Sequence, residues 1–172
     1  GIAKGFAADA AAAKLRSEGI NSALINLGGN VLALGSKADG SSWRIGIQNP
    51  DSSRGDYIGI ADISSKAVVT SGKYERFFIA PDGRRYHHIL STSDGYPVEN
   101  GISQVSIIAS DSMTADAMST AVFSLGLNEG LKTAENISNA EAIIVLESGD
   151  VYITSGLSES FKLTDPTFKI VN

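Results

Sequence analysis

The chain has 172 residues and contains no cysteine. A disulfide framework, a thiolate metal site and a cysteine nucleophile are therefore excluded. No apolar run approaches the roughly 18 residues that a membrane-spanning helix needs. The nucleotide-binding motifs GxGxxG and Walker A are missing as well. These absences remove several common routes to function before any single residue is considered.

Basic charge is also scarce, with 14 Lys and Arg against 19 Asp and Glu and a net charge of -5. The basic residues are scattered apart from the pair Arg84-Arg85, so nucleic acid is not expected as a partner. The hydrophobic content of 42% is enough for a domain with its own core. No repeat or linker divides the chain. We predict one domain over residues 1–172, and interpret a chain that opens within a helical pattern as a fragment.

The spacing of apolar and turn-forming residues predicts a mixed fold. An alanine-rich helix is expected over 2–18, ended by Gly19. Helices are also expected over 112–125, ended by Gly126, and over 129–136, followed by a hairpin of 142–146 and 151–154. Short β-like runs separated by turn residues are expected at 23–27, 31–34, 43–47, 57–63, 67–70, 73–79, 84–90 and 105–109. This order indicates α+β, an antiparallel sheet with helices packed on one face.

Asp116 and Thr120 stand four residues apart in a predicted helix of otherwise small and apolar residues. Their oxygens therefore share one helix face. A carboxylate and a hydroxyl together suit a hard cation such as Mg²⁺. In the alternative, both residues have structural roles. Asp116 interacts favourably with the positive end of the helix dipole at the N-terminus, and the Thr120 hydroxyl donates to a backbone carbonyl. The spacing alone favours that alternative, and both remain open.

His87 and His88 lie in a strand pattern, so their imidazoles face opposite sides and do not chelate one metal as a pair. A histidine that faces a cleft would suit proton transfer or a phosphate contact, and a structural hydrogen bond is the alternative. Lys4 lies in the first turn of the first helix, where free N–H groups and its charge would attract phosphate. The alternative for Lys4 is a solvated surface side chain.

Segments in a fixed order carry a family resemblance. They are GIAKGFA at 1–7, NLGGN at 26–30, TSGKYER at 70–76, HIL at 88–90 with GYP at 95–97, and ADAMST at 115–120. In this order they resemble motifs of the ApbE family, the FAD:protein FMN transferases once called thiamine-biosynthesis lipoproteins. Two departures stand out. Ser91-Thr92 replaces the family's Asp-Pro, and the family has an N-terminal half of similar size that this sequence lacks.

The resemblance implies a T-fold-like α+β arrangement and a set of site residues. The implied Mg²⁺ ligands are oxygen donors: the backbone carbonyl of Gly1 and the side chains of Asp116, Ser119 and Thr120. The implied contacts to FAD are Lys4, His88 and, through its backbone, Leu90. His88 is also the implied catalytic residue, which orients the pyrophosphate or helps to move a proton.

The implied reaction is attack by a Thr or Ser hydroxyl of an acceptor protein on the FMN phosphorus of FAD, with AMP leaving. The implied acceptors are flavin-carrying subunits of membrane redox complexes. The implied location is extracytoplasmic, as a membrane-anchored lipoprotein in the full-length protein. Two alternatives remain open. One is a Mg-dependent FAD pyrophosphatase that gives FMN and AMP. The other is a non-catalytic flavin-binding protein, suggested by the altered Ser91-Thr92 loop.

Overall fold

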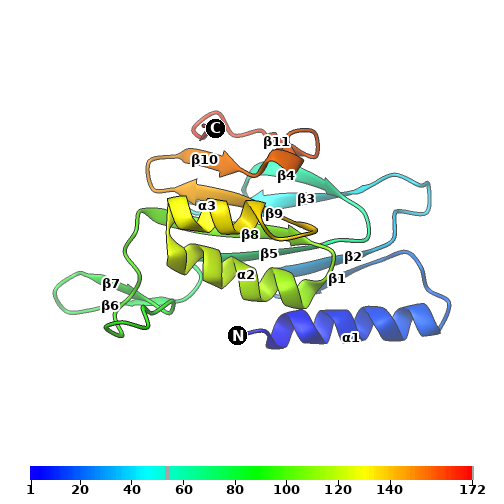
Figure 1. The fold of residues 1–172 in the computed structure, drawn as a ribbon, viewed down its shortest axis with the longest axis horizontal. Helices are drawn as coiled ribbons and strands as arrows, with labels where there is room; N and C mark the ends of the chain where they lie inside the picture. Colours follow the sequence, from blue (N-terminus) through cyan, green and yellow to red (C-terminus); the bar gives the residue numbers. More distant parts are fainter. Residues whose placement is uncertain (53–54, 172) are drawn as a thin grey trace.

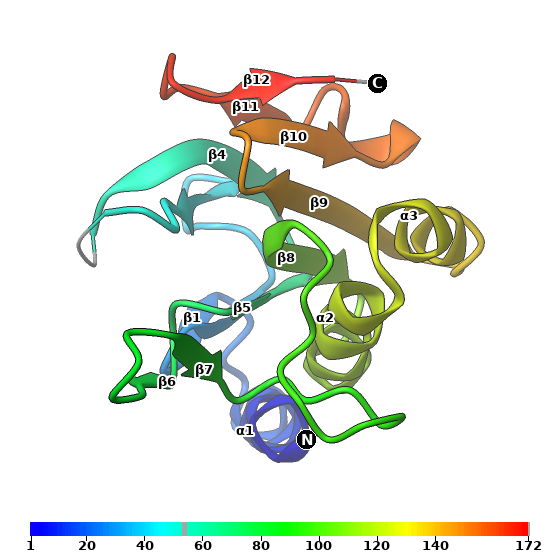
Figure 2. The same cartoon turned by 90° about the vertical axis from the view of Figure 1, so that its left-hand side faces the viewer.

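The computed structural model describes residues 1–52 and 55–171. These residues form a layer of helices, a central seven-stranded sheet and a three-stranded sheet (Figures 1 and 2). The helical elements are α1 (Ala3–Ser17), α2 (Ser112–Leu125), α3 (Leu127–Glu135) and the short 3₁₀ helix η1 (Ser155–Leu157). None of the helices in the described part of the chain is both long and apolar enough to cross a membrane.

The central sheet has the order β1-β2-β5-β8-β9-β10-β12. Its strands are β1 (Ala23–Leu27), β2 (Asn30–Leu34), β5 (Ala67–Gly72), β8 (Ile102–Ala109), β9 (Ala140–Leu146), β10 (Asp150–Ile153) and β12 (Lys169–Ile170). Neighbours are antiparallel except β10 and β12, which are parallel. The second sheet comprises β11 (Phe161–Leu163), β4 (Tyr57–Ile63) and β3 (Trp43–Gln48). A separate hairpin pairs β6 (Phe77–Ile79) with β7 (Arg85–His87) and projects from the body (Figure 1).

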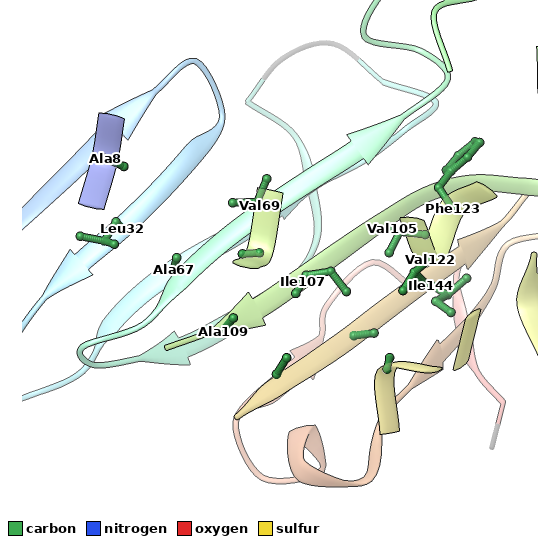
Figure 3. Close-up of a cluster of buried hydrophobic side chains, with 14 of the residues drawn as sticks. Ala8, Leu32, Ala67, Val69, Val105, Ile107, Ala109, Val122, Phe123 and Ile144 are labelled. Carbon is green, nitrogen blue, oxygen red and sulfur yellow. The ribbon is translucent and has the colours of Figure 1, made fainter. Parts of the chain in front are cut away.

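Small residues bring the helix layer close to the sheet. Gly5, Ala8 and Ala12 form the buried face of α1. Figure 3 shows Ala8 above Leu32 in the same cluster as side chains of α2 and of the central strands. Alanine and glycine keep the helix axis near the sheet because no long side chain separates them. The N-terminus of α1 is therefore held against the start of α2.

A second core lies on the other face of the central sheet, where the three-stranded sheet covers it. Ile47 and Ile58 pack there against Val68 and Ile143. Covered on both faces, the central strand β8 is buried along its whole length. A strand buried on both faces shows a continuous rather than an alternating apolar pattern.

The predicted α+β class with helices on one face is confirmed, with several corrections. The run 73–79 is a strand only from Phe77, since residues 73–76 form a turn, and the run 84–90 is a strand only over Arg85–His87. The strands β11 and β12 follow the predicted final hairpin and were missed. Strands of three and two residues are too short to show an alternating pattern. The expected antiparallel sheet also contains the parallel pair β10–β12.

Candidate cation and phosphate site

A cleft of about 510 Å³ opens where α1, α2, the β1–β2 turn and the end of β5 meet. It contains these residues predicted from the sequence: Gly1, Lys4, His88, Asp116 and Thr120. The rest of its lining includes several glycines, among them Gly28 and Gly29 of the β1–β2 turn. Nothing lies within 4 Å of a Cβ atom built on either glycine, so this wall offers bare backbone to a ligand.

Asp116 lies in α2 with 6% of its surface exposed. Its Oδ2 accepts a hydrogen bond of 2.9 Å from the backbone N–H of Gly5 in the first turn of α1. Asp9 of α1 makes the reciprocal contact, because its carboxylate accepts from the N–H groups of Ser112 and Met113 at 2.8 and 2.9 Å. The carboxylate of Asp116 thus faces the positive end of the α1 dipole, which stabilises its charge.

Thr120 lies one helical turn after Asp116 and also lines the cleft, so the predicted shared face is confirmed. Its Oγ1 is 3.2 Å from the Oγ of Ser71 on β5. Ser119 is fully buried and does not line the cleft. Its hydroxyl bonds the Asp116 backbone carbonyl at 3.0 Å and Ser71 Oγ at 2.8 Å. The structure therefore places Ser119 behind the cleft, and not among its lining oxygens.

The oxygen atoms in the cleft fit the Mg²⁺ that the family resemblance implies. Asp116 and Thr120 supply oxygen only, and Gly1, whose carbonyl the resemblance implies as a further ligand, lines the same cleft. Within residues 1–52 and 55–171, no three His, Cys, Asp or Glu side chains are grouped to hold a metal. One carboxylate with hydroxyl, carbonyl and water oxygens is the kind of site that Mg²⁺ accepts, often together with substrate phosphates.

The N-terminus of α1 offers an anion site beside this carboxylate. Its N-cap residue, Ile2, makes no side-chain cap hydrogen bond, and the first turn itself holds no acidic residue. Lys4 is exposed and lines the cleft. A helix N-terminus with free N–H groups and a neighbouring lysine attracts phosphate. The cleft therefore combines oxygen atoms that suit a cation with N–H groups and a lysine that suit an anion.

His88 is exposed at the cleft wall, and Arg76 lines the cleft beside it. The backbone N–H of His88 donates to the Arg76 carbonyl at 3.1 Å, and its ring Nδ1 is 3.2 Å from the same oxygen. Because a carbonyl only accepts, this second bond requires a proton on Nδ1. The Nε2 atom of a neutral His88 is then a proton acceptor.

Leu90 is not in the cleft. It is 53% exposed and lines a separate depression of about 640 Å³ formed with the loop that follows it. In that loop Ser91 stands where the motif resemblance implies aspartate, and its Oγ accepts from the Ser93 N–H at 3.2 Å. A side-chain oxygen that accepts from the N–H two residues on is also what aspartate provides in such turns. The substitution therefore keeps a turn-forming contact.

His87 is the neighbour of His88 but points into the protein, with 6% of its surface exposed. Its Nδ1 accepts from the Ile89 N–H at 3.3 Å, so Nε2 carries the proton and donates to the Val98 carbonyl at 3.2 Å. The ring meets Phe123 of α2 edge-on. Burial is the main cause that lowers the pKa of His87. The predicted opposite orientation of the two histidines is confirmed.

Stability is expected to fall as the pH drops below about 6.5 because of His87. An unfolded histidine titrates near pH 6.5, whereas the pKa of folded His87 is lower. Between these two values the unfolded state binds more protons, so the free energy of unfolding decreases as the pH decreases. Urea unfolding between about pH 7.5 and about pH 5 measures this slope. His87→Gln, whose amide offers both a donor and an acceptor, should flatten it. An unchanged slope in that variant would contradict the assignment.

Sequence reasoning gave no role to several residues at or near the cleft. Ser71 and Arg76 lie in the TSGKYER motif, and Gly5 lies in the GIAKGFA motif. Their contacts join different elements of the fold, so the motifs alone did not indicate them. Asn30 is fully buried, and neither of its amide atoms has a hydrogen-bond partner in the described residues. The available signal for Asn30 was its place in the NLGGN motif at 26–30, directly before the strand predicted over 31–34.

The architecture and this cleft together define a layered α+β domain with a candidate site for a cation and a phosphate. The model of the ApbE family matches residues 1–144, and the chain belongs to that family. A relative named FAD:protein FMN transferase from Klebsiella pneumoniae is 37% identical over 99% of this chain. Another of the same name, from Treponema pallidum, is 35% identical over 97% of it.

Solved structures agree with this assignment. The ApbE protein from Thermotoga maritima matches 92% of this chain with a TM-score of 0.84 and 39% identity. The flavinyl transferase ApbE from Pseudomonas stutzeri matches 92% with a TM-score of 0.75 and 34% identity. In each case this chain spans about half of the other protein: 52% and 48% of the two relatives, and 51% and 49% of the two structures.

Proposed function

We propose that this chain supplies the cation and diphosphate site of a Mg-dependent flavin transferase, which moves FMN from FAD to a Thr or Ser hydroxyl of an acceptor protein. The observation that carries the proposal is the one cleft that joins Asp116 and Thr120 to Lys4 in the first turn of α1. Relatives at 37% and 35% identity that bear the name FAD:protein FMN transferase support it.

In this reaction an acceptor oxygen forms a bond to the FMN phosphorus, and the phosphorus–oxygen bond to AMP breaks. AMP leaves with the electron pair of that bond. Mg²⁺ held by Asp116, Thr120 and the Gly1 carbonyl would neutralise charge on the diphosphate when bound. Lys4 and the free N–H groups of α1 would hold phosphate oxygens. His88 would take the proton of the acceptor hydroxyl at Nε2, since its Nδ1 proton is committed to the Arg76 carbonyl.

The acceptors that we propose are flavin-carrying subunits of membrane redox complexes. We propose an extracytoplasmic location for the full-length protein as a membrane-anchored lipoprotein. Both proposals are supported by the motif resemblance to the ApbE family.

The test combines the chain with FAD, Mg²⁺ and an acceptor domain, followed by a denaturing gel viewed for flavin fluorescence. The relative from K. pneumoniae serves as the positive control. We expect a fluorescent acceptor band that disappears with a chelator. Release of AMP without that band would favour an FAD pyrophosphatase. Retention of FAD without any product would favour a flavin-binding protein, and either result would overturn the transfer reaction.

A further inference from the structure

We propose that Ser71 is a positioning residue that orients the Thr120 hydroxyl toward a cation. It does so through a one-way series of hydrogen bonds, which we call the hydroxyl chain: Thr120, Ser71, Ser119 and the Asp116 backbone carbonyl. This inference rests on the cation site of the proposed function. Ser71 on the neighbouring strand also lines the cleft, and we assign its effect on the cation to its hydrogen bond with Thr120.

The direction of the hydroxyl chain is fixed at its inner end. Ser119 Oγ lies 3.0 Å from the backbone carbonyl oxygen of Asp116. A carbonyl oxygen only accepts hydrogen bonds, and a serine hydroxyl has one proton to give. The proton of Ser119 is therefore committed to Asp116. Ser119 is fully buried, so solvent water does not compete for this proton.

The remaining two bonds follow in order. Ser71 Oγ lies 2.8 Å from Ser119 Oγ, whose proton is already used, so Ser71 must donate. Ser71 Oγ also lies 3.2 Å from Thr120 Oγ1, and its own proton is now used, so Thr120 must donate. Every proton of the hydroxyl chain thus points away from Thr120 and toward Ser119 and Asp116.

This direction matters for Thr120 because a hydroxyl can present either a proton or a lone pair to its surroundings. With its proton directed at Ser71, Thr120 Oγ1 presents lone pairs to the cleft that it lines. A cation is attracted by lone pairs and repelled by a hydroxyl proton. Partners that orient a metal ligand commonly change metal affinity by about 10-fold to about 100-fold when they are removed.

The packing of α2 on β5 holds the hydroxyl chain together. Ser71 follows Val69 by two residues on β5, and Val69 belongs to the core on the helix side. Side chains two apart on a strand share a face, so Ser71 also faces α2. A matched control lies away from the cleft, where the buried hydroxyl of Thr154 accepts from the Ala142 N–H at 2.9 Å.

The test is a titration of the 172-residue chain with Mn²⁺, followed by electron paramagnetic resonance, because free and bound Mn²⁺ differ in their signals. Mn²⁺ prefers the same oxygen ligands as Mg²⁺. We expect Ser71→Ala to weaken Mn²⁺ binding by about 10-fold. Ser71→Thr keeps the hydroxyl and should restore affinity to within about 3-fold of the unmodified chain. Thr154→Val removes a buried hydroxyl outside the cleft and should leave affinity unchanged.

The outcomes separate this inference from the proposed function. Normal affinity in Ser71→Ala, together with lost affinity in Asp116→Asn, would overturn the hydroxyl chain and leave the cation site standing. Equal losses in Ser71→Ala and Thr154→Val would also overturn it, because the effect would then come from general loosening of the domain. A further loss when Ser71→Ala is added to Thr120→Val would overturn it as well, because Ser71 would then bind the cation directly. An unmodified chain that binds no Mn²⁺ would overturn both proposals. Thermal unfolding of each variant shows that the compared proteins are folded.

Discussion

Replacing Asp116 by asparagine is expected to reduce cation affinity by at least about 100-fold while the fold stays in place. The asparagine oxygen can still accept the hydrogen bond from the Gly5 N–H, which Asp116 accepts at 2.9 Å. What disappears is the negative charge, in a cleft that has few other acidic groups. Since a neutral amide is a poor ligand for Mg²⁺ compared with a carboxylate, binding should fail for electrostatic reasons alone.

The measurement is the Mn²⁺ titration, with flavin transfer to an acceptor as the functional counterpart. Exchange of a charge-assisted hydrogen bond for a neutral one costs about 1 kcal/mol, so the melting temperature should drop by only about 2–4 °C. Asp82→Asn is the control, because Asp82 is an exposed carboxylate outside the cleft. Unchanged affinity in Asp116→Asn would remove Asp116 from the proposed ligands.

Replacing Gly5 by alanine is expected to destabilise the domain by about 3 kcal/mol and to disturb the cleft at the same time. A Cβ atom at Gly5 would lie 2.4 Å from the backbone oxygen of Ser112 and 2.6 Å from Cα of Met113. These are backbone atoms of the first turn of α2, so no side chain can rotate away. The two helices would have to separate, which would pull the Gly5 N–H from Asp116.

Urea unfolding measures the loss of stability, and the Mn²⁺ titration measures the effect on the cleft. Ala10→Ser is the matched control, since it adds one heavy atom to an exposed position of the same helix. That control should cost about 0.5 kcal/mol, the difference in helix propensity. If Gly5→Ala were as stable as Ala10→Ser, the close contact between α1 and α2 would not be a packing constraint.

Both predictions depend on one structural feature, the exchange of carboxylates between α1 and α2. Asp9 of α1 accepts from N–H groups at the start of α2, and Asp116 of α2 accepts from Gly5 at the start of α1. Each carboxylate also meets the positive end of the partner helix dipole. The residue proposed to hold the cation is thus fixed in place by the packing that forms the helix layer.

Much of the helix that carries the site was predictable. Helix α2 has the predicted bounds, Ser112–Leu125. Asp111 caps its start by accepting from the Thr114 N–H at 2.7 Å, and Gly126 ends it with a positive φ. These are local signals, carried by residues within one turn of each end. The i, i+4 spacing placed Asp116 and Thr120 on one face for the same local reason.

The sequence by itself determined the α+β class, the helix α2, and the shared face of Asp116 and Thr120 on it, because each of these depends on short-range spacing. The tertiary structure alone decided which hydroxyls reach the cleft. Ser119 and Thr120 are adjacent in sequence, yet only Thr120 lines the cleft, while Ser119 bonds Ser71 behind it. Likewise only the crossing of α1 over α2 made Gly5 the partner of Asp116. Contacts between residues about fifty or a hundred positions apart are set by how the layers pack, and no local pattern records that packing.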